Sequence, residues 1–268
     1  MGFKSNPTAT QTILIQSTDK KISSVMLSQS ADIISKRLKS FSADKFEIKL
    51  FPEKNQIQIT VSNKQNIKIT ESLITQKGKL EFYETYDYKG LANLLKGDTT
   101  LLKFLNADSV HGKSARLICA SADRVKEFNK HLNSAAINGK CRFAWATMFD
   151  DPEACLFALN LNPENLIPLT GADIESFAAK FDKTIQNDCI DFKFKKYAIP
   201  VWAAATRQNL GKEIAIVLDN TVLYAPFVND EIKGGNCTIS GDFTHVQVQY
   251  IVAIGSGGEL PAEFKAVK

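Results

Sequence analysis

The chain has 268 residues and a formal net charge of +4, and its side chains are 44% hydrophobic and 23% charged. These values are typical of a soluble globular protein with one large domain or two smaller ones. They argue against a nucleic-acid partner, because the lysines are scattered among acidic residues and arginine is rare.

The N-terminal third of the chain alternates between strand-like and helix-like patterns. Apolar and polar residues alternate at 46–50 and again at 57–61, and the polar turn between them predicts a hairpin. Ser28 to Ser30 can cap a helix that continues through Phe41. In chain order the predicted elements are a strand at 12–16, this helix, the two hairpin strands, a helix at 69–76 and a strand at 80–82. This β-α-β-β-α-β order is the ferredoxin-like arrangement.

The middle of the chain predicts a small α+β subdomain. A leucine-rich stretch precedes a strand at 116–120 and a helix with Phe128 on its apolar face. Phe143 and Trp145 then alternate with smaller residues, and Phe157 belongs to a second alternating run after a turn. These two runs predict a terminal hairpin.

The last hundred residues return to strands and helices. Asp219 and Asn220 form a two-residue turn between two β-branched runs, which predicts another hairpin. Thr244 can cap the helix that follows it. The predicted elements are a strand at 190–194, a helix at 202–208, hairpin strands at 214–218 and 222–225, a strand at 237–240 and a helix at 246–254.

This C-terminal part resembles the end of the first extracytoplasmic domain of SecD, a subunit of bacterial protein export. That family has Gly-Lys-x-x-Ala-Ile-Val-Leu-Asp-Gly, followed by Ala-Pro, Gly-Gly, Ile-Ser-Gly-x-Phe-Thr and Leu-Pro. An aromatic-x-x-x-Thr pattern before them corresponds to Thr206. The matching residues here are Gly211, Lys212, Ala215 to Asp219, Ala225, Pro226, Gly234, Gly235, Ile239, Ser240, Gly241, Phe243, Thr244, Leu260 and Pro261.

The N-terminal segment resembles the same family through fewer residues. The family's Arg-containing helix corresponds to Arg37, its Glu-x-Ile to Glu47 and the residues after it, and its Leu-Glu-Phe strand to 80–82. The family's early Gly-Gly is replaced by Ser17-Thr18-Asp19. The resemblance implies a ferredoxin-like α+β base of two βαββαβ-type halves, at 10–85 and 164–268, with a small α+β head inserted at 86–163.

No residue pattern predicts a catalytic or metal site. The five cysteines form no Cys-x-x-Cys, and none of the three histidines lies in a nucleophile or ligand motif. Gly234-Gly235 lacks the context of a phosphate loop, so it is interpreted as a turn. We therefore expect no catalysis, no metal, no cofactor and buried thiols, although one disulfide is compatible with a location outside the cytoplasm.

The resemblance implies a non-enzymatic domain on the periplasmic side of the inner membrane. It would bind emerging unfolded preprotein and assist translocation, with Sec translocon components as further partners if it is membrane-anchored. No stretch approaches the roughly 18 apolar residues of a membrane helix, and the N-terminus has no apolar signal core. We therefore expect either an excised domain or a chain whose anchor is absent.

Exposed aromatic side chains on the head would contact the polypeptide. The candidates are Phe104, Phe143, Trp145 and Phe157, which could instead fill the core of the head. One alternative function is a solitary cell-envelope adaptor or scaffold that retains the SecD-like fold. Another is a hydrolase, which would require Cys, His and acidic side chains to converge in one pocket.

Overall fold

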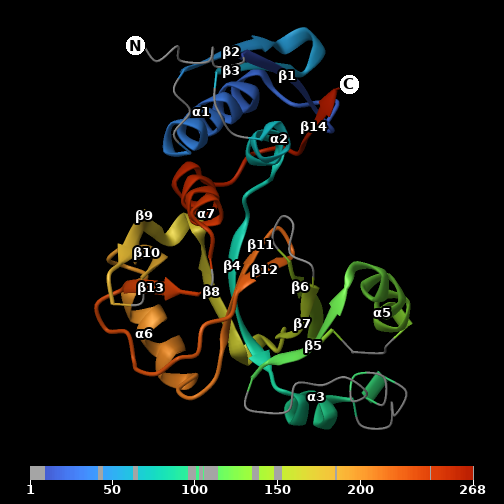
Figure 1. The fold of residues 1–268 in the computed structure, drawn as a ribbon, viewed down its shortest axis with the longest axis vertical. Coiled ribbons are helices and arrows are strands. Elements are labelled where there is room, and N and C mark those ends of the chain that lie inside the picture. Colours follow the sequence, from blue (N-terminus) through green and yellow to red (C-terminus); the bar gives the residue numbers. More distant parts are fainter. Residues whose placement is uncertain are drawn as a thin grey trace, which may run out of the picture. The chain divides into compact units, whose positions relative to one another are not determined.

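The computed structural model describes residues 10–41, 45–62, 66–95, 101–102, 105, 114–134, 139–147, 153–184, 186–241 and 243–267. Its contacts divide the chain into two compact units, which we describe separately (Figure 1). The first consists of Met1–Lys79, Glu175–Phe192 and Thr238–Lys268, and the second of Leu80–Ile174 and Lys193–Cys237. Each unit therefore combines segments that are far apart in the sequence.

The first unit contains a four-stranded antiparallel sheet in the order β14-β1-β3-β2. Its strands are β1 (Thr10–Ser17), β2 (Lys45–Phe51), β3 (Gln56–Ser62) and β14 (Phe264–Val267). Ile57, Ile59 and Val61 of the central strand β3 are fully buried, whereas the residues between them are partly exposed. This alternation is that of a sheet with one covered face, and it confirms the predicted hairpin.

Three helices belong to this unit: α1 (Ser24–Ser40), α2 (Ile67–Thr75) and α7 (His245–Gly257). Helices α1 and α2 pack against the sheet, and α7 packs against α1 (Figure 1). Helix α1 begins earlier than predicted, because Ser23 rather than Ser28 caps it by accepting a hydrogen bond from the Met26 amide. Ser30 lies inside the helix, where its hydroxyl donates to the Met26 carbonyl. Among the described residues no helix is both long and apolar enough to cross a membrane.

The strand at 80–82 was expected to complete this sheet, but it belongs to another one. β4 (Leu80–Tyr86) pairs with β11 and β8 in the second unit. The position beside β1 is taken by β14, whose Ala266 lies opposite Ile15. The βαββαβ element order is therefore as predicted, whereas the sheet uses a strand from the other end of the chain.

A further sheet has three strands in the order β13-β10-β9. It consists of β9 (Ile174–Asp182), β10 (Asn187–Phe194) and β13 (Asn236–Ser240). The division between the two units falls within β9, β10 and β13. Phe177 of β9 stacks on Phe192 of β10, with ring centroids 5.9 Å apart.

The second unit is built on a seven-stranded sheet, ordered β5-β7-β6-β12-β11-β4-β8. Its further strands are β5 (Arg116–Ser121), β6 (Cys141–Ala146), β7 (Glu153–Asn160), β8 (Leu166–Thr170), β11 (Ile214–Leu218) and β12 (Thr221–Tyr224). An additional pairing of β7 with β4, at Thr85 and Tyr86, closes five of these strands into a ring. Every residue of β11 is buried, and such a strand needs covered faces and partners on both sides. β4 supplies one of these partners, which accounts for its place here.

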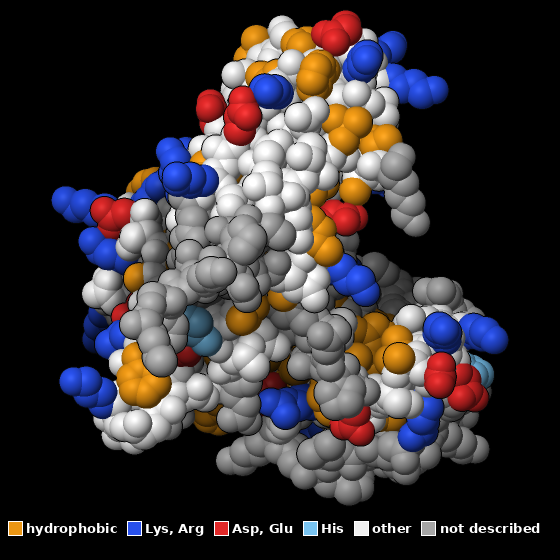
Figure 2. Space-filling model, turned by 45° about the horizontal axis from the view of Figure 1, so that its top comes forward, with side chains coloured by type: hydrophobic (Ala, Val, Ile, Leu, Met, Phe, Trp, Pro, Cys, Tyr) orange, Lys and Arg blue, Asp and Glu red, His pale blue; other side chains and the backbone are white. Residues whose placement is uncertain are grey.

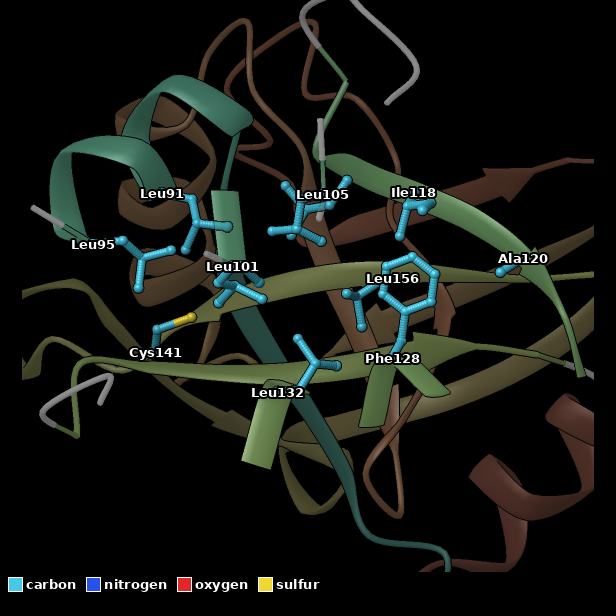
Figure 3. Packing of buried hydrophobic residues seen from close by; sticks show 12 residues of the cluster. Leu91, Leu95, Leu101, Leu105, Ile118, Ala120, Phe128, Leu132, Cys141 and Leu156 are labelled. Carbon is cyan, nitrogen blue, oxygen red and sulfur yellow. The ribbon is translucent and has the colours of Figure 1, made fainter. Parts of the chain in front are cut away.

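Two apolar clusters of described residues lie in this unit. The first comes from four strands of the ring and from Ala115, which precedes β5, and consists of Ala115, Ala144, Phe157, Leu159, Ala215, Val217 and Val222. The second lies under α3 (Tyr88–Leu94) and α5 (Ala122–Ser134) and combines their side chains with Leu101, Leu105 and residues of β5, β6 and β7 (Figure 3). Figure 3 shows Phe128 and Leu132 of α5 directed toward Leu156 of β7, and Cys141 beside Leu101 in the same cluster.

The seven-stranded sheet draws on all three sequence segments that were expected to form the base and the head. β5, β6 and β7 come from 86–163, β4 precedes that segment, and β8, β11 and β12 follow it. The contact units thus divide the chain at other points than the predicted boundaries. The assignment of base and head remains a prediction.

A disulfide joins β5 to β7 between Cys119 and Cys155, which lie directly opposite each other. The sequence left open whether any two of the five cysteines pair. Cys141, Cys189 and Cys237 are free and buried, as expected.

Candidate functional site

The aromatic residues proposed to contact a polypeptide lie in different environments. Phe143 and Trp145 on β6 are partly buried and pack against the cluster under α3 and α5. Trp145 meets Phe128 edge-on at 6.0 Å, and its indole N–H donates to Asn129 Oδ1 at 2.8 Å. Phe157 is only 3% exposed and belongs to the core of the ring. Phe104 lies outside the described residues.

Thr206, the threonine of the family pattern, holds a loop onto α6 (Ile199–Gln208). It is fully buried, its hydroxyl donates to the Trp202 carbonyl at 3.0 Å, and the same oxygen accepts from the Ile232 amide at 3.0 Å. Trp202 in turn packs on Phe82 and Phe194, with ring centroids 5.2 and 4.9 Å away. This motif residue therefore has a structural role.

The turn residues of the family motif adopt left-handed backbone conformations. Asp219 and Asn220 have φ angles of 48° and 71°, as a two-residue hairpin turn requires. Gly235 has φ of 70°, and a Cβ there would lie 2.6 Å from Cγ1 of Ile199. Glycine is thus required at this position both by the backbone and by the close approach of α6.

The remaining motif residues end or connect elements. Thr244 caps α7 in a capping box with Gln247, and the Leu260 amide donates to the Lys77 carbonyl at 2.7 Å. The Gly241 carbonyl accepts from the side-chain amide of Asn187 at 2.8 Å. The others follow β12 or lie in or beside β13, α7 and the segment before β14: Ala225, Pro226, Gly234, Ile239, Ser240, Phe243 and Pro261.

A buried carboxylate lies on β4, and it was not among the candidate residues predicted from the sequence. Glu84 is 7% exposed and receives three side-chain amide donors. The amide of Asn209 donates to Oε1 at 2.9 Å, and the amides of Asn165 and Asn160 donate to Oε2 at 3.1 and 3.5 Å. The sequence did hold a signal, because Glu84 continues the alternation of Leu80 and Phe82 and so places a charge on the apolar face of a strand.

Two cavities of about 450 Å³ each meet at Glu84 and Asn165, which line both. The first lies between β8 and α6, and most of its wall is apolar: Leu166, Ile167, Pro168, Pro200, Val201, Ala204 and Ala205. The second lies between the end of β4, the start of α3 and the segment before β11. Its charged lining residues are Glu84, Asp87, Lys212 and Glu213.

Glu213 is the second partly buried carboxylate of this region. Burial raises its pKa, while hydrogen bonds from the Ala115 amide at 3.0 Å and the Ser114 hydroxyl at 3.2 Å lower it. Arg116 lowers it further through its charge. Burial also raises the pKa of the Tyr86 hydroxyl, which donates to Asn160 Oδ1 at 2.9 Å. Two of the carboxylates that line the cavity, Glu84 and Glu213, are therefore poorly solvated, whereas Asp87 is exposed.

The hydrolase alternative requires Cys, His and acidic side chains to lie together in one pocket, and the described residues form no such set. Burial raises the pKa of the Cys141 and Cys237 thiols to about 12, so neither supplies a thiolate nucleophile near neutral pH. His245 is exposed and pairs with Asp188 at 2.8 Å. Within the described ranges there is no cluster of three or more His, Cys, Asp or Glu that could hold a metal. His111 lies outside those ranges.

Comparison with known proteins finds that part of this chain is similar to SecD. Residues 158–262 match the family model described as the SecDF P1 head subdomain. The chain resembles a SecD periplasmic domain. The protein translocase subunit SecD of Rickettsia bellii is 37% identical over 100 residues, which are 37% of this chain and 19% of the relative. SecD of Leptotrichia buccalis is 32% identical over 100 residues, 37% of this chain and 24% of the relative.

Solved SecDF structures share the fold over nearly the whole chain. SecDF in a super-membrane-facing form has a TM-score of 0.58 at 21% identity, covering 96% of this chain and 29% of that one. A second structure, of a membrane component SecDF that enhances protein export, has a TM-score of 0.54 at 20% identity, with 96% and 98% coverage. The chain spans about a fifth of the length of the SecD relatives from Rickettsia.

The matched range extends beyond one predicted segment. Residues 158–262 fall mostly in the segment that the sequence analysis placed in the base, while the family model bears the word head. This range includes β8 and α6, which carry most of the wall of the first cavity, and it also includes the C-terminal motif residues from Thr206 to Pro261. The SecD-like part of the chain therefore contains one wall of each cavity.

Proposed function

We propose that this chain is an extracytoplasmic, non-enzymatic SecD-like domain that binds unfolded preprotein and assists its translocation across a membrane. The match of 158–262 to the SecDF P1 head subdomain carries this proposal. The shared fold with SecDF over 96% of the chain supports it, because a common fold presents the matched residues in a common framework.

The finer architecture is part of this proposal. We infer a ferredoxin-like base of two βαββαβ-type halves with an inserted head at 86–163. The sheet β14-β1-β3-β2 with α1 and α2 against it supports the N-terminal half, with β14 in the place of its last strand.

A periplasmic location is consistent with the disulfide bond in this chain. The Cys119–Cys155 disulfide is of the kind that persists in oxidising compartments and is rare in the cytosol. Components of the Sec translocon would then be the partners, since the relatives are named as subunits of the protein translocase.

The absence of turnover is supported by the burial of the thiols. Cys141 and Cys237 have pKa values raised to about 12, and His245 is engaged with Asp188 at the surface. The chain would then act by holding its ligand rather than by changing it. Phe143 and Trp145 remain candidates for contact with that ligand, whereas the burial of Phe157 assigns it to the core.

The test is binding of an unfolded polypeptide. A fluorescently labelled protein, reduced and carboxymethylated so that it cannot fold, should raise its anisotropy when this chain is added. The same protein labelled in its native, disulfide-bonded form is the control and should not bind. Equal binding of both forms, or binding of neither, would contradict the proposal.

A further inference from the structure

We propose that the two cavities at Glu84 form one site for an extended polypeptide segment in which apolar side chains adjoin a lysine or arginine. This inference rests on the proposed function, because it gives the unfolded polypeptide a place and a preferred sequence. It differs from the aromatic candidates, since neither Phe143 nor Trp145 lines either cavity.

The first cavity provides the apolar half of the site. Leu166 is 47% exposed although it lies on a strand, and Val201 and Ala204 of α6 face it across the cavity. β8 ends the order of its sheet, so its outer side has no strand partner within the described part of the chain. Such an edge pairs with extended chains, and pockets beside it select their side chains.

The second cavity provides the acidic half. Among the described residues its lining carries three carboxylates, Glu84, Asp87 and Glu213, and one cation, Lys212. Among the described residues, neutral side-chain amides donate hydrogen bonds to Glu84, and a hydroxyl and a backbone amide donate to Glu213. Within the described ranges no lysine or arginine lies at ion-pair distance from either glutamate.

Arg116 acts on Glu213 through its charge, but neither Glu84 nor Glu213 has an ion-pair partner among the described residues, so a cationic side chain of a ligand can pair with them. Carboxylates that share a poorly solvated cavity repel each other, and an ammonium or guanidinium group removes that cost. Arginine fits best, because its planar donors can engage two carboxylate oxygens at once. Figure 2 shows basic and acidic side chains interspersed over the visible face, so the excess of acids in this cavity is a local feature.

The two halves are close enough for one ligand. Both cavities include Glu84 and Asn165 in their walls, so they meet at these residues. An extended chain advances about 3.3 Å per residue, which lets neighbouring side chains enter adjoining cavities. The site thus selects an apolar run followed directly by a positive charge.

Three labelled peptides test this selection. They share a run of alternating leucine and valine and differ at one following position, which is arginine, glutamine or glutamate. We expect the arginine peptide to bind about tenfold more tightly than the glutamate peptide, as measured by fluorescence anisotropy at low salt. The difference should shrink at high salt.

Two variants and a control locate the site. Ala204→Trp fills the first cavity and should weaken all three peptides about tenfold. Glu213→Gln keeps a hydrogen-bond acceptor but removes one of the three carboxylate charges, and should reduce the preference for arginine over glutamine. Ala178→Trp on the exposed strand β9 adds the same ring away from both cavities and should change nothing. Thermal unfolding of each variant verifies that it is folded.

The outcomes separate this inference from the proposed function. Binding of the unfolded protein together with equal affinity for the three peptides would overturn the inference and leave the proposed function standing. The same holds if Ala204→Trp, while folded, binds like the wild type. Failure to bind any unfolded polypeptide would overturn both.

Discussion

At the scale of single residues, Arg37 is a buried charged side chain that is stabilised by hydrogen bonds to backbone carbonyls. It is fully buried, and its guanidinium donates to the carbonyls of Leu73, Gln76, Lys77 and Gly258 at 2.5 to 3.0 Å. These carbonyls lie at the C-terminal ends of α2 and α7, where helix dipoles favour a cation. The side chain thereby joins three helices of the first unit.

Replacing this side chain should therefore cost more than its apolar volume suggests. Arg37→Met leaves the carbonyls without their donors, and we expect a loss of about 3 kcal/mol in the free energy of unfolding. Urea denaturation followed by circular dichroism measures it. Lys36→Met is the matched control at an exposed neighbouring position and should stay within about 0.5 kcal/mol of the wild type. Similar losses in both variants would show that the carbonyl contacts contribute little.

At the scale of elements, the link between β5 and β7 is covalent as well as hydrogen-bonded. Cys119 and Cys155 are separated by 36 positions in the sequence and lie opposite each other in the ladder. β7 also pairs with β6 and β4, so the disulfide fixes β5 to the strand on which the ring depends.

Removing this link should destabilise the second unit. The double variant Cys119→Ala/Cys155→Ala is expected to lose about 3 kcal/mol, because a closed loop of this length restricts the unfolded chain. Guanidinium unfolding with and without a phosphine reductant measures the effect. The reductant should lower the midpoint of the wild type and leave that of the double variant unchanged. A wild type that is insensitive to the reductant, with the bond shown to be reduced, would contradict the prediction.

At the scale of the whole molecule, the two ends of the chain complete one sheet. β14 lies on the open side of β1, and α7 packs against α1 and α2. The Leu260 amide and the Thr18 amide add hydrogen bonds between the terminal segments, to Lys77 and Glu263 respectively. The N-terminal segment thus lacks part of its own core.

A fragment of residues 1–79 is accordingly expected not to fold alone. It retains β1, β2, β3, α1 and α2 but leaves the apolar sides of α1 and β1 uncovered. Heating the fragment should give no cooperative transition by circular dichroism, whereas the full chain should give one. A sharp transition in the fragment would show that the C-terminal segment is dispensable for the first unit.

The SecD resemblance and much of the local structure could be predicted because they depend on short spans. Alternation identified β2 and β3, and the Asp219-Asn220 pair identified the hairpin of β11 and β12. The candidate site was not predicted in the same way. Glu84 showed a signal within its own strand, but Asn209 and Glu213 approach it only after the chain has folded.

The amino-acid sequence by itself determined many of the local elements, such as the β2–β3 hairpin and the turn at Asp219-Asn220, because periodicity and turn chemistry act over a few neighbouring residues. It did not predict α3, β8, β9 or β14. Tertiary structure alone decided that β14 rather than β4 lies beside β1, that Cys119 faces Cys155, and that the carboxylates share a cavity. These pairings join positions up to some 250 residues apart. At such separations, the partner of a strand is selected by the burial of whole apolar faces of sheets and helices. This selection depends on distant residues, so no short stretch of sequence predicts it.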